Sequence, residues 1–161
     1  MENKNKTLKW LHTEMAGNIH VDDRIQQYCP KLRGIYGIFV QDDTKRCVYV
    51  GRSSNIYRRM FGGDGHITNL MKGFHTNPEL KEAMQDIDNK KISIEILKEV
   101  PFQYDDYYKD MQRLASAENS FIDQFQNMDQ CLHQVPEGTA MAKKIWDQYK
   151  KHHDLNEMDC K

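Results

Sequence analysis

Two apolar segments separated by a short polar turn constrain the fold of this chain more than any other feature. Residues 35–40 are apolar almost throughout and include two aromatic residues with high β propensity. Such a run predicts a strand that is covered on both faces. Residues 41–44 form a polar turn without glycine, and residues 47–50 return as a second strand that ends at Gly51. The sequence therefore predicts a hairpin with a loop of several residues.

A basic helix and a third strand complete the predicted core. Ser53 or Ser54 is placed to cap a helix that follows the hairpin. Residues 91–100 alternate apolar and polar side chains, which is typical of a half-buried strand. Further helices are predicted at residues 8–15, 18–28, 66–74, 77–87, 105–125 and 139–153.

These elements predict an α+β fold with a small, three-stranded, mainly antiparallel sheet flanked by helices. Residues 32–135 would form this domain. Residues 1–31 would be a helical lead-in, and residues 136–161 a C-terminal helix and tail.

Composition excludes several classes of protein. The 161 residues are 39% hydrophobic and 29% charged, and no run of 18 apolar residues predicts a membrane-spanning helix. The N-terminus lacks the apolar region of a secretory signal. The four cysteines form no C-x-x-C pair, which argues against a zinc knuckle. We therefore expect an intracellular protein, cytoplasmic or nucleoid/nuclear, without contact to a membrane.

Charge is spread unevenly along a chain whose formal net charge is −1. Residues 44–63 contain no acid and five basic residues, namely Lys45, Arg46, Arg52, Arg58 and Arg59. One interpretation is a solvated face. The other is a local basic patch that contacts DNA phosphates weakly or with the help of a partner.

Glu118 does not fit the helix on which it is predicted to lie. It falls four residues after Leu114 and four before Ile122, and so lies within the apolar stripe. An unpaired carboxylate there would cost several kcal/mol. The sequence leaves three alternatives: a salt bridge to a lysine or arginine, a position at the edge of the stripe, or a carboxylate held inward to coordinate a hard cation.

The motifs of this chain resemble those of the GIY-YIG nuclease superfamily. Their residues are Gly34-Ile35-Tyr36 on the first strand, Tyr49-Val50-Gly51 on the second, Arg59 on the following helix and Glu118 on the later helix. The resemblance covers roughly residues 32–135 and implies a three-stranded antiparallel sheet surrounded by helices. Neither tripeptide by itself is specific for the superfamily. The two tripeptides together with the arginine and the glutamate, in this order and on the predicted strands and helices, are specific for it.

The chain departs from the family pattern at two positions. Many members have a histidine about one helical turn after the arginine, where this chain has Gly63. His66 is a candidate substitute, or an ordinary surface histidine. Members often have an asparagine a dozen or so residues after the glutamate. Here Asn127 is slightly early, and around the expected spacing lie Gln130, Leu132 and His133.

The resemblance implies hydrolysis of DNA phosphodiester bonds with one divalent cation, Mg²⁺ or Mn²⁺. Tyr36 would be the base that activates a water, and Tyr49 would position that water or share its proton. Arg59 would hold the non-bridging phosphate oxygens, and Glu118 would hold the metal. Arg52 and Arg58 would contact backbone phosphates or solvent.

A non-catalytic module of the same fold, binding nucleic acid or a protein, is the alternative function. The terminal helices could pair two copies of the chain or bind a protein partner.

Four clustered aromatic residues could stack on bases or pack into the core or its rim; they are Phe102, Tyr104, Tyr107 and Tyr108.

Overall fold

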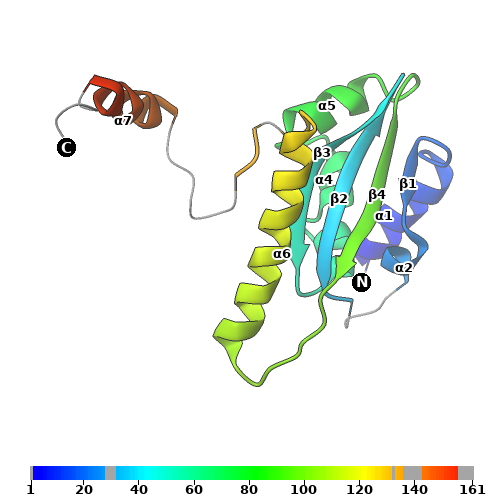
Figure 1. Cartoon of the computed structure of the whole chain (residues 1–161). Coiled ribbons are helices and arrows are strands. Elements are labelled where there is room, and N and C mark those ends of the chain that lie inside the picture. The colour runs from blue at the N-terminus through cyan, green and yellow to red at the C-terminus, as the bar shows by residue number, and fades with distance from the viewer. Residues whose placement is uncertain (1, 28–31, 132, 136–142, 156–161) are drawn as a thin grey trace.

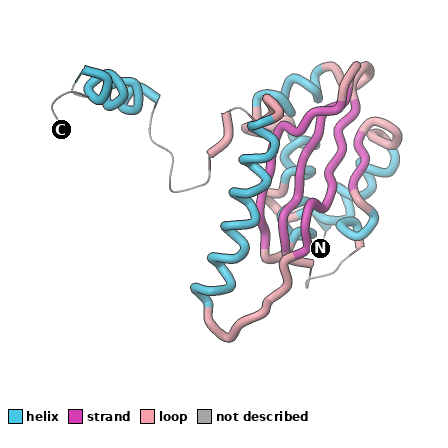
Figure 2. Tube along the Cα trace, in the orientation of Figure 1, coloured by secondary structure: helices cyan, strands magenta, loops and turns pink. Residues whose placement is uncertain are grey.

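The hairpin predicted from the sequence forms the centre and one edge of the sheet. β2 (Gly34–Gln41) pairs antiparallel with β3 (Lys45–Ser53), which forms that edge. β4 (Lys91–Glu99) pairs antiparallel with the other side of β2. The computed structural model describes residues 2–27, 32–131, 133–135 and 143–155. Figures 1 and 2 show the arrangement of these elements.

The sheet has four strands rather than the three predicted. β1 (Ile19–Val21) pairs parallel with β4 and gives the strand order β1-β4-β2-β3. The predicted helix over residues 18–28 was therefore wrong: its described residues form β1 and then the short helix α2 (Asp23–Gln26). A strand of three residues is too short to show a period of two in the sequence.

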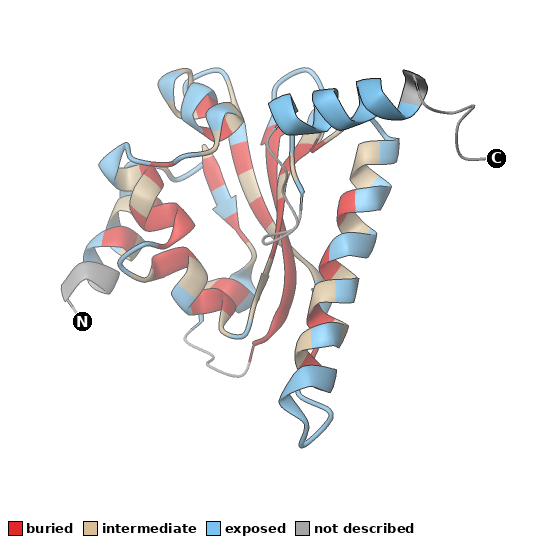
Figure 3. Cartoon of the chain, turned by 90° about the vertical axis from the view of Figure 1, so that its left-hand side faces the viewer, coloured by how far each residue is buried: buried red, intermediate tan, exposed pale blue. Residues whose placement is uncertain are grey.

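Helices cover both faces of the sheet (Figure 3). One face carries α1 (Glu2–Thr13), α3 (Ile56–Phe61), α4 (His66–Lys72) and α5 (Pro78–Gln85). The other face carries the long helix α6 (Tyr107–Asn127). Side chains of β2 alternate between the two cores, with Tyr36 and Ile38 in the first and Ile35 in the second. This explains why the strand is apolar almost throughout.

The first core extends across the predicted domain boundary at residue 31. Leu11 of α1, Ile19 and Val21 of β1 and Ile25 of α2 are all buried in it. The lead-in is therefore part of the packed unit and is not wholly helical.

Caps fix the ends of the helices that position the site. Asn77 and Asp106 cap α5 and α6, and Pro78 opens α5. The cap of α3 is Asn55, whose side chain accepts from the Arg58 amide, rather than Ser53 or Ser54. Ser53 supports this cap by accepting from the Asn55 amide.

The last helix, α7 (Lys143–Leu155), stands apart from the sheet in Figure 1. Residues 139–142 of its predicted span lie outside the described residues. Within the described chain, no helix combines the length and apolar character needed to cross a membrane.

Candidate functional site

Tyr36 and Tyr49 share one face of the hairpin, and Gly51 makes room for both. Tyr36 is fully buried, and its ring centroid lies 6.1 Å from that of Tyr49. Gly51 is the register partner of Tyr36 on β3. A Cβ atom at position 51 would lie closer than 3 Å to both tyrosine side chains. The glycine of the second motif is thus required by the close packing of the two phenols.

Two histidines extend from Tyr36 as a chain of hydrogen bonds. The Tyr36 hydroxyl lies 2.8 Å from His66 Nε2, and His66 Nδ1 lies 2.8 Å from His75 Nε2. The Asn77 backbone N–H donates to His75 Nδ1 at 3.0 Å. Both imidazoles are buried, and their rings stack with centroids 5.1 Å apart.

The backbone N–H of Asn77, at the end of this series of hydrogen bonds, fixes the direction in which each of the other bonds donates. Because the Asn77 amide can only donate, a neutral His75 carries its proton on Nε2 and donates to His66 Nδ1. His66 then carries its proton on Nε2 and donates to the Tyr36 oxygen. The hydroxyl proton of Tyr36 is therefore left for another acceptor.

Burial keeps both histidines neutral. It lowers the pKa of His66 to about 2, with smaller contributions from the charges of Arg59 and His75. Burial and the Arg59 charge also lower the pKa of His75. His66 follows the glycine-rich loop of residues 62–65 and is the first residue of α4, where a helix was predicted, but the interpretation as an ordinary surface histidine was wrong because the side chain is buried. No periodicity or motif in the sequence points to His75.

Arg59 supplies positive charge next to the two phenols. Its charge acts to lower the pKa of Tyr36, but burial and the neighbouring Tyr49 raise that pKa more, to well above its usual value. Tyr36 is therefore a neutral phenol in this state, and Arg59 alone does not make it a base at neutral pH. The Arg59 guanidinium also donates to the Asp64 carbonyl oxygen at 3.2 Å, which ties it to the glycine-rich loop.

A cavity of about 690 Å³ lies beside these groups. Tyr49, Arg59, His66 and His75 line one part of it, and His133 and Gln134 line another. Residues far apart in sequence thus present phenol, guanidinium and imidazole groups to one space. This arrangement suits the binding of an anionic group next to hydrogen-bond donors.

Glu118 is buried as its place in the apolar stripe predicts, and it forms a salt bridge. It is 7% exposed, and its Oε1 accepts from Arg52 Nη1 at 2.7 Å. The salt bridge to an arginine, one of the three alternatives from the sequence, is the one observed. Arg52 directly follows Gly51, so Glu118 lies against β3 beside the tyrosine motif. Helix α6, which carries Glu118, covers one face of the sheet, and α4, which carries His66, covers the other face. Tyr36, Tyr49 and Arg59 form one cluster, and Glu118 is held in a separate contact.

Metal binding at Glu118 would involve few protein ligands. Among the residues that the structure describes, no group of three or more His, Cys, Asp or Glu side chains is arranged to hold a metal ion. Mg²⁺ commonly keeps several waters and takes one or two carboxylates, so a single glutamate fits this ion better than it fits zinc. A metal at Glu118 would share the carboxylate with Arg52 or displace it.

The outer edge of β3 is covered by the segment after α6. Gln134 Oε1 accepts from the Val50 amide at 2.9 Å, and Gln134 Nε2 donates to the Val50 carbonyl. Gln130 Oε1 accepts from the Cys47 amide at 2.6 Å, and Cys131 Sγ lies 3.3 Å from Cys47 Sγ. Gln134 thus satisfies both backbone groups of the central motif residue.

Asn127, the predicted support residue, ends α6 and is exposed. Gln134 supports the motif strand instead, and the sequence interpretation missed it. A glutamine outside any periodic segment carries no signal that predicts a contact with a strand 84 residues away.

The basic patch of residues 44–63 is partly neutralised. Lys45 pairs with Glu95, Arg46 with Asp42, and Arg52 with Glu118. Arg58 is exposed on α3, and with Arg59 it lines a second hollow of about 510 Å³ beside the glycine-rich loop. Of the five cations, Arg58 and Arg59 are thus the better placed for phosphate contact.

Comparisons of the chain with known protein families, curated proteins and solved structures gave no match.

Proposed function

We propose that this protein is a metal-dependent endonuclease that hydrolyses DNA phosphodiester bonds at a site of the GIY-YIG type. The packing of Tyr36 against Tyr49, beside Arg59, carries this proposal, because Tyr49 and Arg59 line one cavity and Tyr36 lies buried directly behind them. These residues come from two strands and a helix, and Gly51 has no side chain where the two phenols pack. The resemblance of the motifs to the nuclease superfamily gives the reaction.

Arg59 would bind the phosphate that is cleaved. Its planar guanidinium can donate two parallel hydrogen bonds to non-bridging oxygens, and lysine cannot reproduce this geometry. The hydrogen bond from the guanidinium to the Asp64 carbonyl oxygen orients the Arg59 side chain before substrate binds. Arg58, exposed on the same helix, would contact a neighbouring phosphate.

Tyr36 would act on the attacking water. His66 donates to the phenol oxygen, and this bond fixes the ring and directs the hydroxyl proton away from the histidine. The His75 end of the chain meets a backbone N–H that cannot take a proton, so the histidines position Tyr36 rather than act as a proton sink. For Tyr36 to accept a proton from water, its pKa has to fall, and positive charge from Arg59 acts in that direction.

Glu118 would hold Mg²⁺ or Mn²⁺ at the edge of the site. When bound there, the ion supplies positive charge that stabilises the leaving oxygen. Arg52 orients the carboxylate until then. Glu118 and Arg52 would have to separate, at least in part, on metal binding.

Cleavage of supercoiled plasmid DNA with Mg²⁺ or Mn²⁺ tests the proposal. We expect Arg59→Ala and Glu118→Ala to lower the rate by about 100-fold or more, as is typical when a charged group at a reacting phosphate is removed. Arg46→Ala is the matched control, because it removes the same charge from a surface pair with Asp42. Undiminished cutting by both site variants would exclude this site.

A non-catalytic binding module remains the second candidate because Glu118 is already paired with Arg52 and the basic patch is partly neutralised. A titration with Mn²⁺, followed by its paramagnetic effect on NMR signals, separates the two functions. Broadening of signals around Glu118 in the wild type but not in Glu118→Gln supports the nuclease. DNA binding without such broadening and without cleavage supports the module.

A further inference from the structure

Four aromatic side chains are exposed together where the loop after β4 leads into α6. Phe102 is 69% exposed, Tyr104 44%, Tyr107 69% and Tyr108 80%. We call Phe102, Tyr104, Tyr107 and Tyr108 the aromatic tip. Their exposure excludes packing in the core, which is one of the alternatives that the sequence left open. Grouped exposed aromatic surface marks an interaction site more often than chance exposure does.

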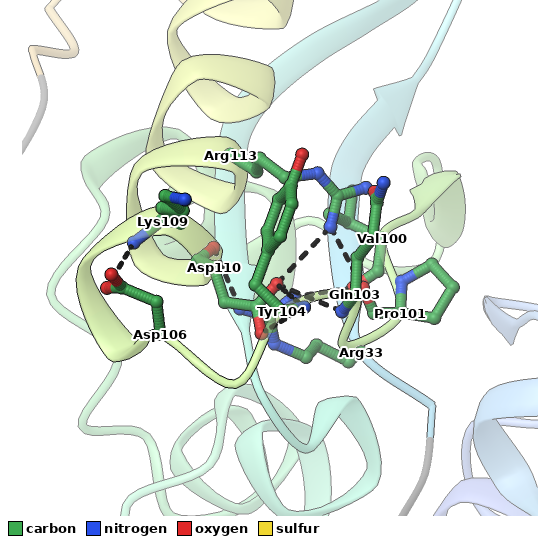
Figure 4. Close-up of polar contacts among 9 residues, drawn as sticks. All are labelled: Arg33, Val100, Pro101, Gln103, Tyr104, Asp106, Lys109, Asp110 and Arg113. Atoms are coloured by element: carbon green, nitrogen blue, oxygen red, sulfur yellow. Dashed lines mark hydrogen bonds and ion pairs between the residues drawn. The ribbon is translucent and has the colours of Figure 1, made fainter.

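Buried charged residues hold the loop of the aromatic tip in one conformation (Figure 4). Arg33 is fully buried and donates to the carbonyl oxygens of Val100 at 2.7 Å and Asp110 at 3.0 Å. The Asp110 carboxylate, 4% exposed, accepts from the Gln103 amide at 3.0 Å and the Tyr104 amide at 3.2 Å. Burying two charged groups is costly, and a plain connecting loop does not require it. The loop is therefore built to present its side chains in a fixed arrangement.

Cations alternate with the rings of the aromatic tip. The Arg33 guanidinium lies 4.4 Å from the centroid of the Phe102 ring. Lys109 and Arg113 lie 5.5 and 5.8 Å from the centroid of the Tyr104 ring. Arg33 is fully buried, so only Lys109 and Arg113 are placed to contact phosphates. Aromatic rings that stack on bases, with cations beside them for the phosphates, are the features that single-stranded nucleic acid binds.

Three acidic residues, Asp105, Asp106 and Asp110, balance the charges of the three cations beside the tip. Asp106 is committed to capping α6 through the amides of Tyr108 and Lys109. Asp110 is buried and paired with Arg113. Asp105 is exposed, so stacking rather than net charge would carry most of the affinity.

Two residues of the aromatic tip, Tyr107 and Tyr108, lie on the same helix as Glu118. Tyr107 and Tyr108 precede Glu118 by eleven and ten residues, which places them about 15 Å away along the axis of α6. A few nucleotides of an extended strand span this distance. Base pairs in a duplex are stacked on their neighbours, so exposed rings stack most readily on unpaired bases.

We propose that the aromatic tip binds unpaired bases of a DNA strand next to the cleavage site, so that the preferred substrate carries a single-stranded segment. The link to cleavage rests on the proposed nuclease function, whereas the binding itself does not. The aromatic tip thus supplies a preference for DNA structure rather than for sequence, because every base has a ring face that can stack.

Fluorescence anisotropy with labelled DNA and EDTA, which prevents cleavage, tests the binding. The probes are a single-stranded oligonucleotide, a blunt duplex, and a duplex with a single-stranded overhang. We expect Tyr107→Ser/Tyr108→Ser to weaken binding of the single strand and the overhang duplex by at least tenfold and to leave the blunt duplex unchanged. Tyr149→Ser on α7, which also removes an exposed tyrosine, is the matched control and should change nothing.

Equal affinity of the wild type and the double variant for the single strand would overturn the inference, as would a wild type that binds no single strand. A tip variant that lost binding of the blunt duplex to the same extent would also contradict it. The cleavage assay separates this result from the nuclease proposal. A wild type that cuts no DNA but loses single-strand binding with the double variant refutes the nuclease and retains the tip as a binding site.

Discussion

At the scale of single residues, a few positions restrict how the tyrosine rings pack and which nitrogen atoms of the histidines carry protons. Gly51 leaves the space that the rings of Tyr36 and Tyr49 occupy. The Asn77 amide fixes which nitrogen of each histidine carries a proton. Burial lowers the pKa of both imidazoles, which favours their neutral form. The result is a neutral, directional chain that ends at Tyr36.

Gly51→Ala should destabilise the protein by about 1–3 kcal/mol, because its new methyl group would overlap the tyrosine rings. Urea denaturation measures this change. Gly63→Ala is the matched control, since nothing lies within 4 Å of a Cβ atom at that position. Equal stability of the two variants would show that the tyrosines can move aside at no cost.

His66 should make the protein less stable as the pH falls below neutrality. Its pKa in the folded state, about 2, lies below the usual value of 6.5, so the unfolded chain binds the proton more readily. Stability is therefore full above about pH 6.5 and falls as the pH is lowered. A histidine that stays neutral only when folded lowers the free energy of unfolding by about 2 kcal/mol between pH 7 and pH 5.

Urea denaturation at both pH values tests this slope. His66→Gln should reduce the loss of stability between pH 7 and pH 5, whatever its effect at pH 7 alone. His20→Gln, at an exposed position of β1, should leave the loss as in the wild type. An unchanged slope in His66→Gln would mean that His66 is protonated in the folded state.

The sequence pointed to Tyr36, Tyr49 and Arg59 as candidate site residues through the motif resemblance, and they lie near one another because local patterns set the positions of residues in or near one hairpin. It also predicted that Glu118 is buried, because the period of a long helix fixes its direction. It did not predict His75 or Gln134. Each reaches the site from a loop or a helix end, where only tertiary packing determines where a side chain points.

At the scale of elements, β3 is an edge strand whose outer side is capped by side chains. An open edge exposes unpaired N–H and C=O groups that can pair with another chain. Gln134 and Gln130 occupy these groups at Val50 and Cys47. The capped portion overlaps the tyrosine motif, so the cap also restrains the candidate site.

Gln134→Ala should loosen β3 at Val50. Loss of two hydrogen bonds to buried backbone groups is expected to cost about 1–3 kcal/mol. Hydrogen exchange of the Val50 amide, followed by NMR, should become faster while amides of β4 stay protected. Gln124→Ala on the exposed face of α6 is the control and should leave exchange at Val50 unchanged. Unaltered exchange in Gln134→Ala would show that the side chain does not cap the strand.

The strands and helices were predicted to different degrees. β2, β3, β4 and α6 have runs or periods long enough to identify them from sequence alone. β1 has only three residues, and its pairing with β4 depends on packing between segments about 70 residues apart. Its absence from the prediction explains both the missing fourth strand and the boundary placed at residue 31.

At the scale of the whole molecule, the two helical layers meet the candidate site from opposite faces of the sheet. The layer of α3 and α4 supplies Arg59 and His66. The layer of α6 supplies Glu118 and, at its beginning, two tyrosines of the aromatic tip. β3 lies between them at the edge of the sheet, where an extended nucleic acid could contact both layers at once.

The two ends of the chain should contribute very differently to stability. The side chains described for α7, at residues 143–153, are all exposed, so α7 buries little apolar surface against the sheet. Leu11 of α1, by contrast, is 2% exposed in the first core. Removal of residues 136–161 should therefore shift the thermal midpoint by no more than about 2 °C. Removal of residues 1–17 opens that core, and should cost several kcal/mol. Calorimetry of both truncated chains measures the difference, and similar losses at the two ends would mean that α7 packs against the domain in solution.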